Sequence, residues 1–152
     1  MKKNHTTVGA LRSVVTKMPE KNLFQRNDEL KVIVLAKRLI KHTMTLTDNQ
    51  NRYPKKARFT LVDPMQKTVV EIYKLLLKAN YLNTNIKSQF EQRQLCQSEA
   101  IYMCDVLLLY IELSLDSNYI NDKSCEYWAR QVIEVKKMIL AWKNGDAKRS
   151  SF

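Results

Sequence analysis

The side chains that could perform catalysis are few and scattered in this 152-residue sequence. Only two histidines occur, His5 near the amino terminus and His42 among lysines and arginines, and neither belongs to a His-Glu-x-x-His metal motif. The two glycines, Gly9 and Gly145, are too few for a glycine-lined loop around phosphates. Cys104 as a nucleophile would need a histidine base, and the sequence suggests none. We therefore expect no catalytic residues, no metal site and no cofactor.

The carboxylates and thiols of the second half do not form a metal-ligand pattern either. Four carboxylates fall on one predicted helix at spacings of six, seven and four residues, which a solvated helix surface explains, since a di-metal bundle would need Glu-x-x-His motifs. They are Glu99, Asp105, Glu112 and Asp116. The three cysteines, Cys96, Cys104 and Cys125, lie among apolar residues at helical spacing without a C-x-x-C pair. We interpret them as reduced core thiols of a cytoplasmic protein, the alternative being a disulfide or a metal set.

The residues that do form a chemical pattern are basic. A predicted helix displays four cations on its solvent face, and the following turn adds four more together with two aromatic residues. No acid occurs between Leu30 and Thr47, although glutamates would relieve the repulsion between neighbouring cations. Cations of this kind bind phosphates by releasing counterions, and Tyr53 could add a stacking face. The alternative is an ordinary solvated basic surface. The candidate binding residues are Lys31, Lys37, Arg38, Lys41, Arg52, Tyr53, Lys55, Lys56 and Arg58, with Phe59 beside them.

Composition agrees with a basic helical protein. Apolar residues make up 45% and charged residues 27% of the chain, which contains only two glycines and three prolines, so turn-rich β architectures are disfavoured. The net charge is +11, and residues 1–58 hold 14 Lys and Arg against four Asp and Glu. Such an excess indicates a polyanionic partner, nucleic acid before membrane. Without an apolar run of about 18 residues or a signal-peptide h-region, we expect no membrane span and a cytoplasmic location.

Four amphipathic segments predict an all-α, up-down-up-down four-helix bundle. We expect helices over residues 27–47, 60–80, 88–117 and 123–144. The spacings Thr60/Asp63 and Ser88/Glu91 are typical of capping boxes, and Gly145 is typical of a helix stop. The predicted organisation is a basic arm over residues 1–26, a bundle over residues 27–145 and a short tail over residues 146–152.

The last predicted helix carries two apolar sets, although one bundle core needs only one. The first set repeats at spacings of four and three residues and suits bundle packing; it consists of Trp128, Val132, Val135, Ile139 and Trp142. The second set, Ala129, Ile133 and Leu140, lies about 100° or more around the helix. It indicates either a broad core contact or an interface between subunits. We expect a homo-oligomer that uses this second set.

A series of short sequence words also occurs in a recognisable order over residues 27–143. They are Arg58-Phe59-Thr60-Leu61-Val62-Asp63, Met65-Gln66, Ile72-Tyr73, Leu107-Leu108, Ile111-Glu112-Leu113, Glu126-Tyr127-Trp128, Val135-Lys136 and Ala141-Trp142. Together they resemble the accessory variability determinant family of diversity-generating retroelements, which is akin to proteins encoded in intervening sequences of bacterial 23S rRNA genes. Pro64 departs from the basic or polar residue expected in that family, and residues 1–26 lie outside the resemblance.

This resemblance implies a non-catalytic accessory protein that assembles as a homopentamer of four-helix protomers. Its implied partners are a reverse transcriptase and template RNA, or an RNA/DNA hybrid, bound through a basic outer surface in support of mutagenic cDNA synthesis. An alternative is a structural or interaction bundle of the wider family with no retroelement. A small enzyme is a third reading that would require a bound metal or cofactor.

Overall fold

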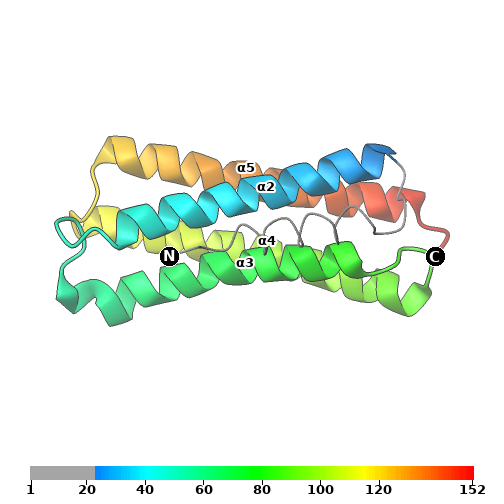
Figure 1. The fold of residues 1–152 in the computed structure, drawn as a ribbon, viewed down its shortest axis with the longest axis horizontal. Helices are drawn as coiled ribbons and strands as arrows, with labels where there is room; N and C mark the ends of the chain where they lie inside the picture. Colours follow the sequence, from blue (N-terminus) through cyan, green and yellow to red (C-terminus); the bar gives the residue numbers. More distant parts are fainter. Residues whose placement is uncertain (1–22) are drawn as a thin grey trace, which may run out of the picture.

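The computed structural model describes residues 23–152, with side chains from Lys31 onward, and this part is a four-helix bundle without strands. Consecutive helices run in opposite directions and short connections join them at the two ends (Figure 1), which confirms the predicted up-down-up-down fold. The helices are α2 (Leu23–Thr47), α3 (Asp63–Tyr81), α4 (Lys87–Asp116) and α5 (Asp122–Arg149). None of the described helices is long and apolar enough to cross a membrane. Residues 1–22 of the predicted basic arm lie outside the described residues.

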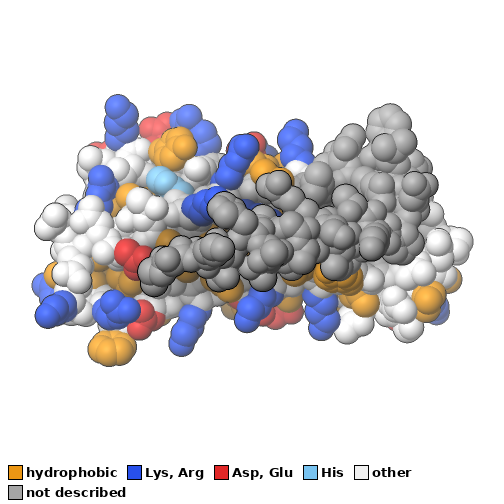
Figure 2. Space-filling view, viewed as in Figure 1, with side chains coloured by type: hydrophobic (Ala, Val, Ile, Leu, Met, Phe, Trp, Pro, Cys, Tyr) orange, Lys and Arg blue, Asp and Glu red, His pale blue; other side chains and the backbone are white. Residues whose placement is uncertain are grey.

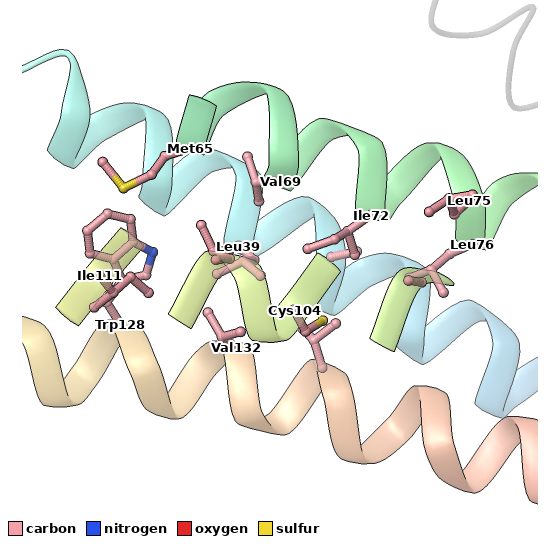
Figure 3. Close-up of a cluster of buried hydrophobic side chains, with 14 of the residues drawn as sticks. Leu39, Met65, Val69, Ile72, Leu75, Leu76, Cys104, Ile111, Trp128 and Val132 are labelled. Carbon is pink, nitrogen blue, oxygen red and sulfur yellow. The ribbon is translucent and has the colours of Figure 1, made fainter. Parts of the chain in front are cut away.

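The core is a continuous column of side chains contributed by all four helices. Figure 3 shows Leu39, Met65, Cys104 and Trp128, one from each helix, directed toward one another. The first apolar set of α5 is buried as predicted, and the indole of Trp128 donates to the Thr43 hydroxyl at 3.1 Å. This bond satisfies the polar atom of a large ring inside the core, so the ring can be buried without an unpaired donor.

The predicted start of the second helix at Thr60 is wrong, because the chain is helical from Lys55. A 3₁₀ turn, η1 (Lys55–Ala57), leads into a π-helical turn, η2 (Arg58–Val62), and then into α3 without a break. The Thr60 hydroxyl donates to the Ala57 carbonyl at 3.5 Å instead of capping a helix. The π turn ends at Val62, two residues before Pro64, whose ring would clash with the carbonyl four residues earlier in a regular α-helix. A wider turn relieves this clash.

Three other predicted helix ends are also wrong. α2 begins at Leu23, within the predicted arm and before the predicted start at residue 27. α4 begins at Lys87 without a side-chain cap, so the Ser88/Glu91 box does not form. α5 continues through Gly145 to Arg149, so the predicted helix stop at Gly145 is wrong as well.

A buried ion pair explains why α5 continues past Gly145. Arg93 of α4 donates from Nε to the Asp146 carboxylate at 2.7 Å, and both side chains are almost fully buried, at 1% and 0% exposure. The Gln97 amide also donates to Asp146 at 2.8 Å, while Arg93 Nη1 donates to the carbonyl of Ala79 at the end of α3. These bonds join three helices at one end of the bundle, and they require Asp146 to remain helical.

Candidate nucleic-acid interface

The outer face of α2 presents the four predicted cations to solvent. Lys31, Lys37, Arg38 and Lys41 are all exposed, and none of them forms an ion pair with a carboxylate of the described residues. The opposite face of the helix is held in the core by Val32, which comes next to Lys31, and by Ala36 and Leu39. Packing of that face therefore directs the ammonium and guanidinium groups outward, where their charges are available to an anion.

These cations spread around α2 instead of forming one cluster. Lys37 lies on the α3 side, with its Nζ 6.0 Å from the centroid of the Tyr73 ring. Arg38 lies on the α5 side, where it lines a groove of about 260 Å³ together with Tyr127, Arg130 and Glu134. The basic surface is therefore a broad band across α2 that reaches toward both neighbouring helices.

The corner between α2 and α3 contains the other predicted cations, which differ in their exposure and in their bonds to other residues. Lys55 and Lys56 are exposed and have no ion-pair partner among the described residues. Arg58 lies 3.7 Å from the Asp63 carboxylate, with 64% of its side chain exposed. Arg52 is half-buried and donates from Nη1 to the Ser124 hydroxyl at 3.2 Å, so it also fastens the corner to α5. Three free or nearly free cations thus lie within one helical turn.

Tyr53 cannot stack on a ligand, which corrects the prediction made for it. Only 3% of the residue is exposed, and its ring packs against Tyr119 with 5.4 Å between centroids. Burial raises the pKa of its phenol, so the group stays neutral and inside the core. The sequence does contain a signal for the burial of Tyr53. Tyr53, Ala57 and Leu61 follow one another at spacings of four residues, and all three are buried, as expected for one inward helical face.

Phe59 is instead the aromatic residue that this corner exposes. It is 83% exposed, more than any other large hydrophobic residue in the described part of the chain. Figure 2 shows Lys and Arg side chains along both long edges of the face. The lower edge follows α3, where sequence reasoning missed three exposed lysines, Lys67, Lys74 and Lys78. Their spacings of seven and four residues place them on one face of a helix, and this pattern in the sequence could have identified them.

His42 lies close to the basic surface but adds little charge to it. Its ring makes edge contacts with Tyr127 and Trp128, at centroid distances of 5.2 and 6.2 Å. Burial is the main cause that lowers the pKa of His42, and the nearby Arg52 lowers it further. The imidazole is therefore neutral near pH 7, when the surrounding lysines and arginines are charged.

The second apolar set of α5 is partly exposed and continues onto α4. Ile133 is 40% and Leu140 is 46% exposed, whereas Ala129 is half-buried. Lys136, which lies between Ile133 and Leu140, donates to the Asp105 carboxylate of α4 at 2.6 Å. Tyr102 and Leu109 flank Asp105 at the same spacings of three and four residues, with 63% and 52% exposure. We call these four residues, Tyr102, Leu109, Ile133 and Leu140, the α4–α5 apolar patch.

Groups suited to catalysis or metal binding do not come together in the described residues. No three His, Cys, Asp or Glu side chains there lie close enough to hold a metal ion. The Cys104 thiol is fully buried, and this burial raises its pKa to about 12, so it is protonated at neutral pH. Cys96 and Cys125 are also free thiols whose pKa values burial raises. The four carboxylates considered for a metal site, Glu99, Asp105, Glu112 and Asp116, are exposed to solvent, as predicted.

Comparison with protein-family models, with curated proteins and with solved structures finds no match for this chain. The resemblance to the accessory variability determinant family therefore stays a prediction from the sequence words themselves. What the chain does has to be argued from its two distinctive surfaces, the basic band with its corner and the α4–α5 apolar patch.

Proposed function

We propose that this protein is a non-catalytic accessory factor of a diversity-generating retroelement, which binds RNA through the basic band of α2 and the adjoining corner. The observation that carries the proposal is the band of exposed cations on α2 that have no carboxylate partner among the described residues, Lys31, Lys37, Arg38 and Lys41. Like charges on one helix face repel each other, and phosphates remove that repulsion when counterions are released. Contacts of this kind position a nucleic acid without reading its sequence.

The family resemblance extends this proposal to a reverse transcriptase as protein partner, to mutagenic cDNA synthesis and to a cytoplasmic homopentamer. Support for self-association comes from the α4–α5 apolar patch, whose four residues surround one ion pair on a single outer face. Burying such a patch between copies removes apolar surface from water. The number of subunits rests on the resemblance alone.

A second candidate is a structural or interaction bundle without a retroelement, and the same apolar patch favours it. In that case the patch binds a protein partner and the basic band is a solvated surface. A reverse-transcriptase gene beside this one, with paired template and variable repeats, supports the first candidate, and copurification of the two proteins tests their association directly.

RNA binding is tested by fluorescence anisotropy with a labelled RNA over a range of salt concentrations. We expect affinity to fall with salt at a log–log slope of about −0.7 to −0.9 per neutralised phosphate. The triple variant Lys37→Glu, Arg38→Glu, Lys41→Glu should bind all RNA sequences more weakly and reduce the magnitude of the slope by about two to three. These side chains are exposed, so circular dichroism should show the same helical content.

The control is a triple reversal of three exposed lysines on α5, Lys123→Glu, Lys137→Glu and Lys148→Glu. It changes the net charge by the same amount and should weaken binding much less. Equal losses in the two triple variants would mean that only the overall charge matters. Equal affinity of the α2 variant and the wild type at low salt would remove the basic band as the binding site.

A further inference from the structure

Phe59 occupies a rigid position that holds its ring away from the protein. It lies in the π turn that joins η1 to α3, and buried residues precede and follow it: Ala57 at 2%, Leu61 at 8% and Val62 at 4% exposure. These three side chains anchor the turn in the core, and Phe59 points away from them with 83% of its surface in solvent. A π turn inside a continuous helix is often found at functional sites.

Exposed cations lie close to Phe59 along the chain, in η1 and η2. Lys55 and Lys56 are both exposed and precede Phe59 by four and three residues, in the 3₁₀ turn that leads directly into the π turn. Arg58 is its immediate neighbour, and its weak contact with Asp63 at 3.7 Å leaves most of the guanidinium in solvent. A single exposed phenylalanine is unremarkable by itself, but an exposed ring among three accessible cations is an arrangement with a definite ligand chemistry.

The ligand that fits this arrangement has a flat ring that can stack on Phe59 and phosphates on either side of that ring. An unpaired nucleotide in an RNA strand has both. Nucleobases stack on aromatic side chains when they are not already stacked in a duplex, while lysine and arginine hold the flanking phosphates. A membrane surface would also attract cations, but membrane binding requires a larger apolar face. The residue after Phe59 is the exposed and polar Thr60, so the corner has no such face.

We propose that Phe59 is a stacking site for one unpaired base of single-stranded RNA, with Lys55, Lys56 and Arg58 on the adjacent phosphates. This inference rests on the proposed RNA binding and makes it more specific, because it predicts a preference for single strands over duplexes. The basic band of α2 supplies affinity for any phosphate backbone, and Phe59 supplies the preference for an unpaired base.

The test compares binding of a single-stranded RNA with binding of a blunt RNA duplex, using the full chain. Phe59→Ala should weaken binding of the single strand roughly 5- to 100-fold, as expected for the loss of one stacked base, and leave duplex binding unchanged. Phe59→Trp should keep the preference for single strands. The matched control is Leu95→Ala, which removes another exposed apolar side chain (69% exposed) from α4. It should change neither the affinity for the single strand nor the affinity for the duplex.

Fluorescence of Phe59→Trp provides a second measurement that a purely structural role would not change. The native tryptophans are buried, Trp128 at 0% and Trp142 at 5% exposure, so emission from an exposed indole should be red-shifted and distinguishable from theirs. Single-stranded RNA should quench this emission, and a strand with abasic sites in place of bases should quench it much less.

The outcomes separate this inference from the proposed function. If Phe59→Ala binds both RNAs like the wild type while the α2 triple variant loses binding, the stacking site is wrong and the proposed function stands. If the wild type binds neither RNA, both are wrong. Binding to phosphatidylcholine–phosphatidylglycerol vesicles that depends on Phe59, without any preference for single-stranded RNA, would also overturn the stacking site.

Discussion

At the scale of single residues, the buried pair of Arg93 and Asp146 is the feature with the largest expected effect on stability. Its two charges are removed from water. The Asp146 carboxylate accepts from Arg93, from the Gln97 amide and from Arg149 Nη2, and Arg93 also donates to the Ala79 carbonyl. Removing one partner of a buried pair leaves the other charge uncompensated in the core. The resulting loss of stability is larger than the stability that the intact pair adds relative to well-packed apolar side chains.

Asp146→Asn should therefore lower the free energy of unfolding by about 3–5 kcal/mol, measured by urea denaturation. The control Glu126→Gln removes a carboxylate from the exposed pair with Arg130 and should cost less than about 1 kcal/mol. The double variant Arg93→Met, Asp146→Leu removes both charges and should be more stable than Asp146→Asn. If the two single variants lose the same stability, the buried pair does not hold the end of the bundle as argued.

At the scale of elements, the helix ends show which local signals the fold uses. Asn121 accepts a bond from the Ser124 amide at 2.8 Å and caps α5, whereas Ser88 lies just inside the start of α4 with no side-chain cap there. A capping side chain stabilises a helix only when its oxygen reaches a free amide. The sequence spacing at Ser88 satisfies the rule for a capping box, but the chain enters the helix one residue earlier.

Asn121→Ala should destabilise the protein by about 0.5–2 kcal/mol through loss of this cap, and Ser88→Ala should change its stability by only a few tenths of a kcal/mol. Thermal unfolding followed by circular dichroism measures both. A large loss on Ser88→Ala together with none on Asn121→Ala would mean that the capping box, and not the observed start at Lys87, describes α4 in solution.

At the scale of the whole molecule, the two distinctive surfaces use different helices. The basic band and its corner use α2 and the turns η1 and η2, whereas the apolar patch uses α4 and α5. Copies that associate through α4 and α5 would leave the cations of α2 accessible. An oligomer of this kind would present several basic bands to one RNA, which raises the overall affinity without any new contact.

Ile133→Glu should dissociate the proposed oligomer, because it places a charge in a contact from which water is excluded. Light scattering should show a smaller particle with the same helical content by circular dichroism. Lys123→Glu, an exposed charge change at the start of the same helix and ten residues before Ile133, is the control and should keep the wild-type size. A monomeric wild type, or an oligomer that Ile133→Glu leaves intact, would exclude the patch as the subunit interface.

Local sequence patterns were sufficient for the four helices and for the exposed cations of α2. Helical periodicity and charge depend on residues within a few turns, so they distinguish the buried face of Val32, Ala36 and Leu39 from the exposed face of Lys37 and Lys41. They also predicted the buried apolar set of α5, which repeats every three or four residues around Trp128. The same local rules misplaced helix ends, because these depend on which groups are free to bond in the folded chain.

Only the tertiary structure decided which residues from distant parts of the sequence meet. Arg93 and Asp146 are 53 residues apart, and their pairing both buries two charges and carries α5 past Gly145. The sequence predicted Tyr53 as the stacking residue, but packing against Tyr119 buries it, while the anchored π turn exposes Phe59. Burial depends on the neighbours that the bundle provides, and those neighbours are set by the packing of whole helices and not by residues nearby in the chain.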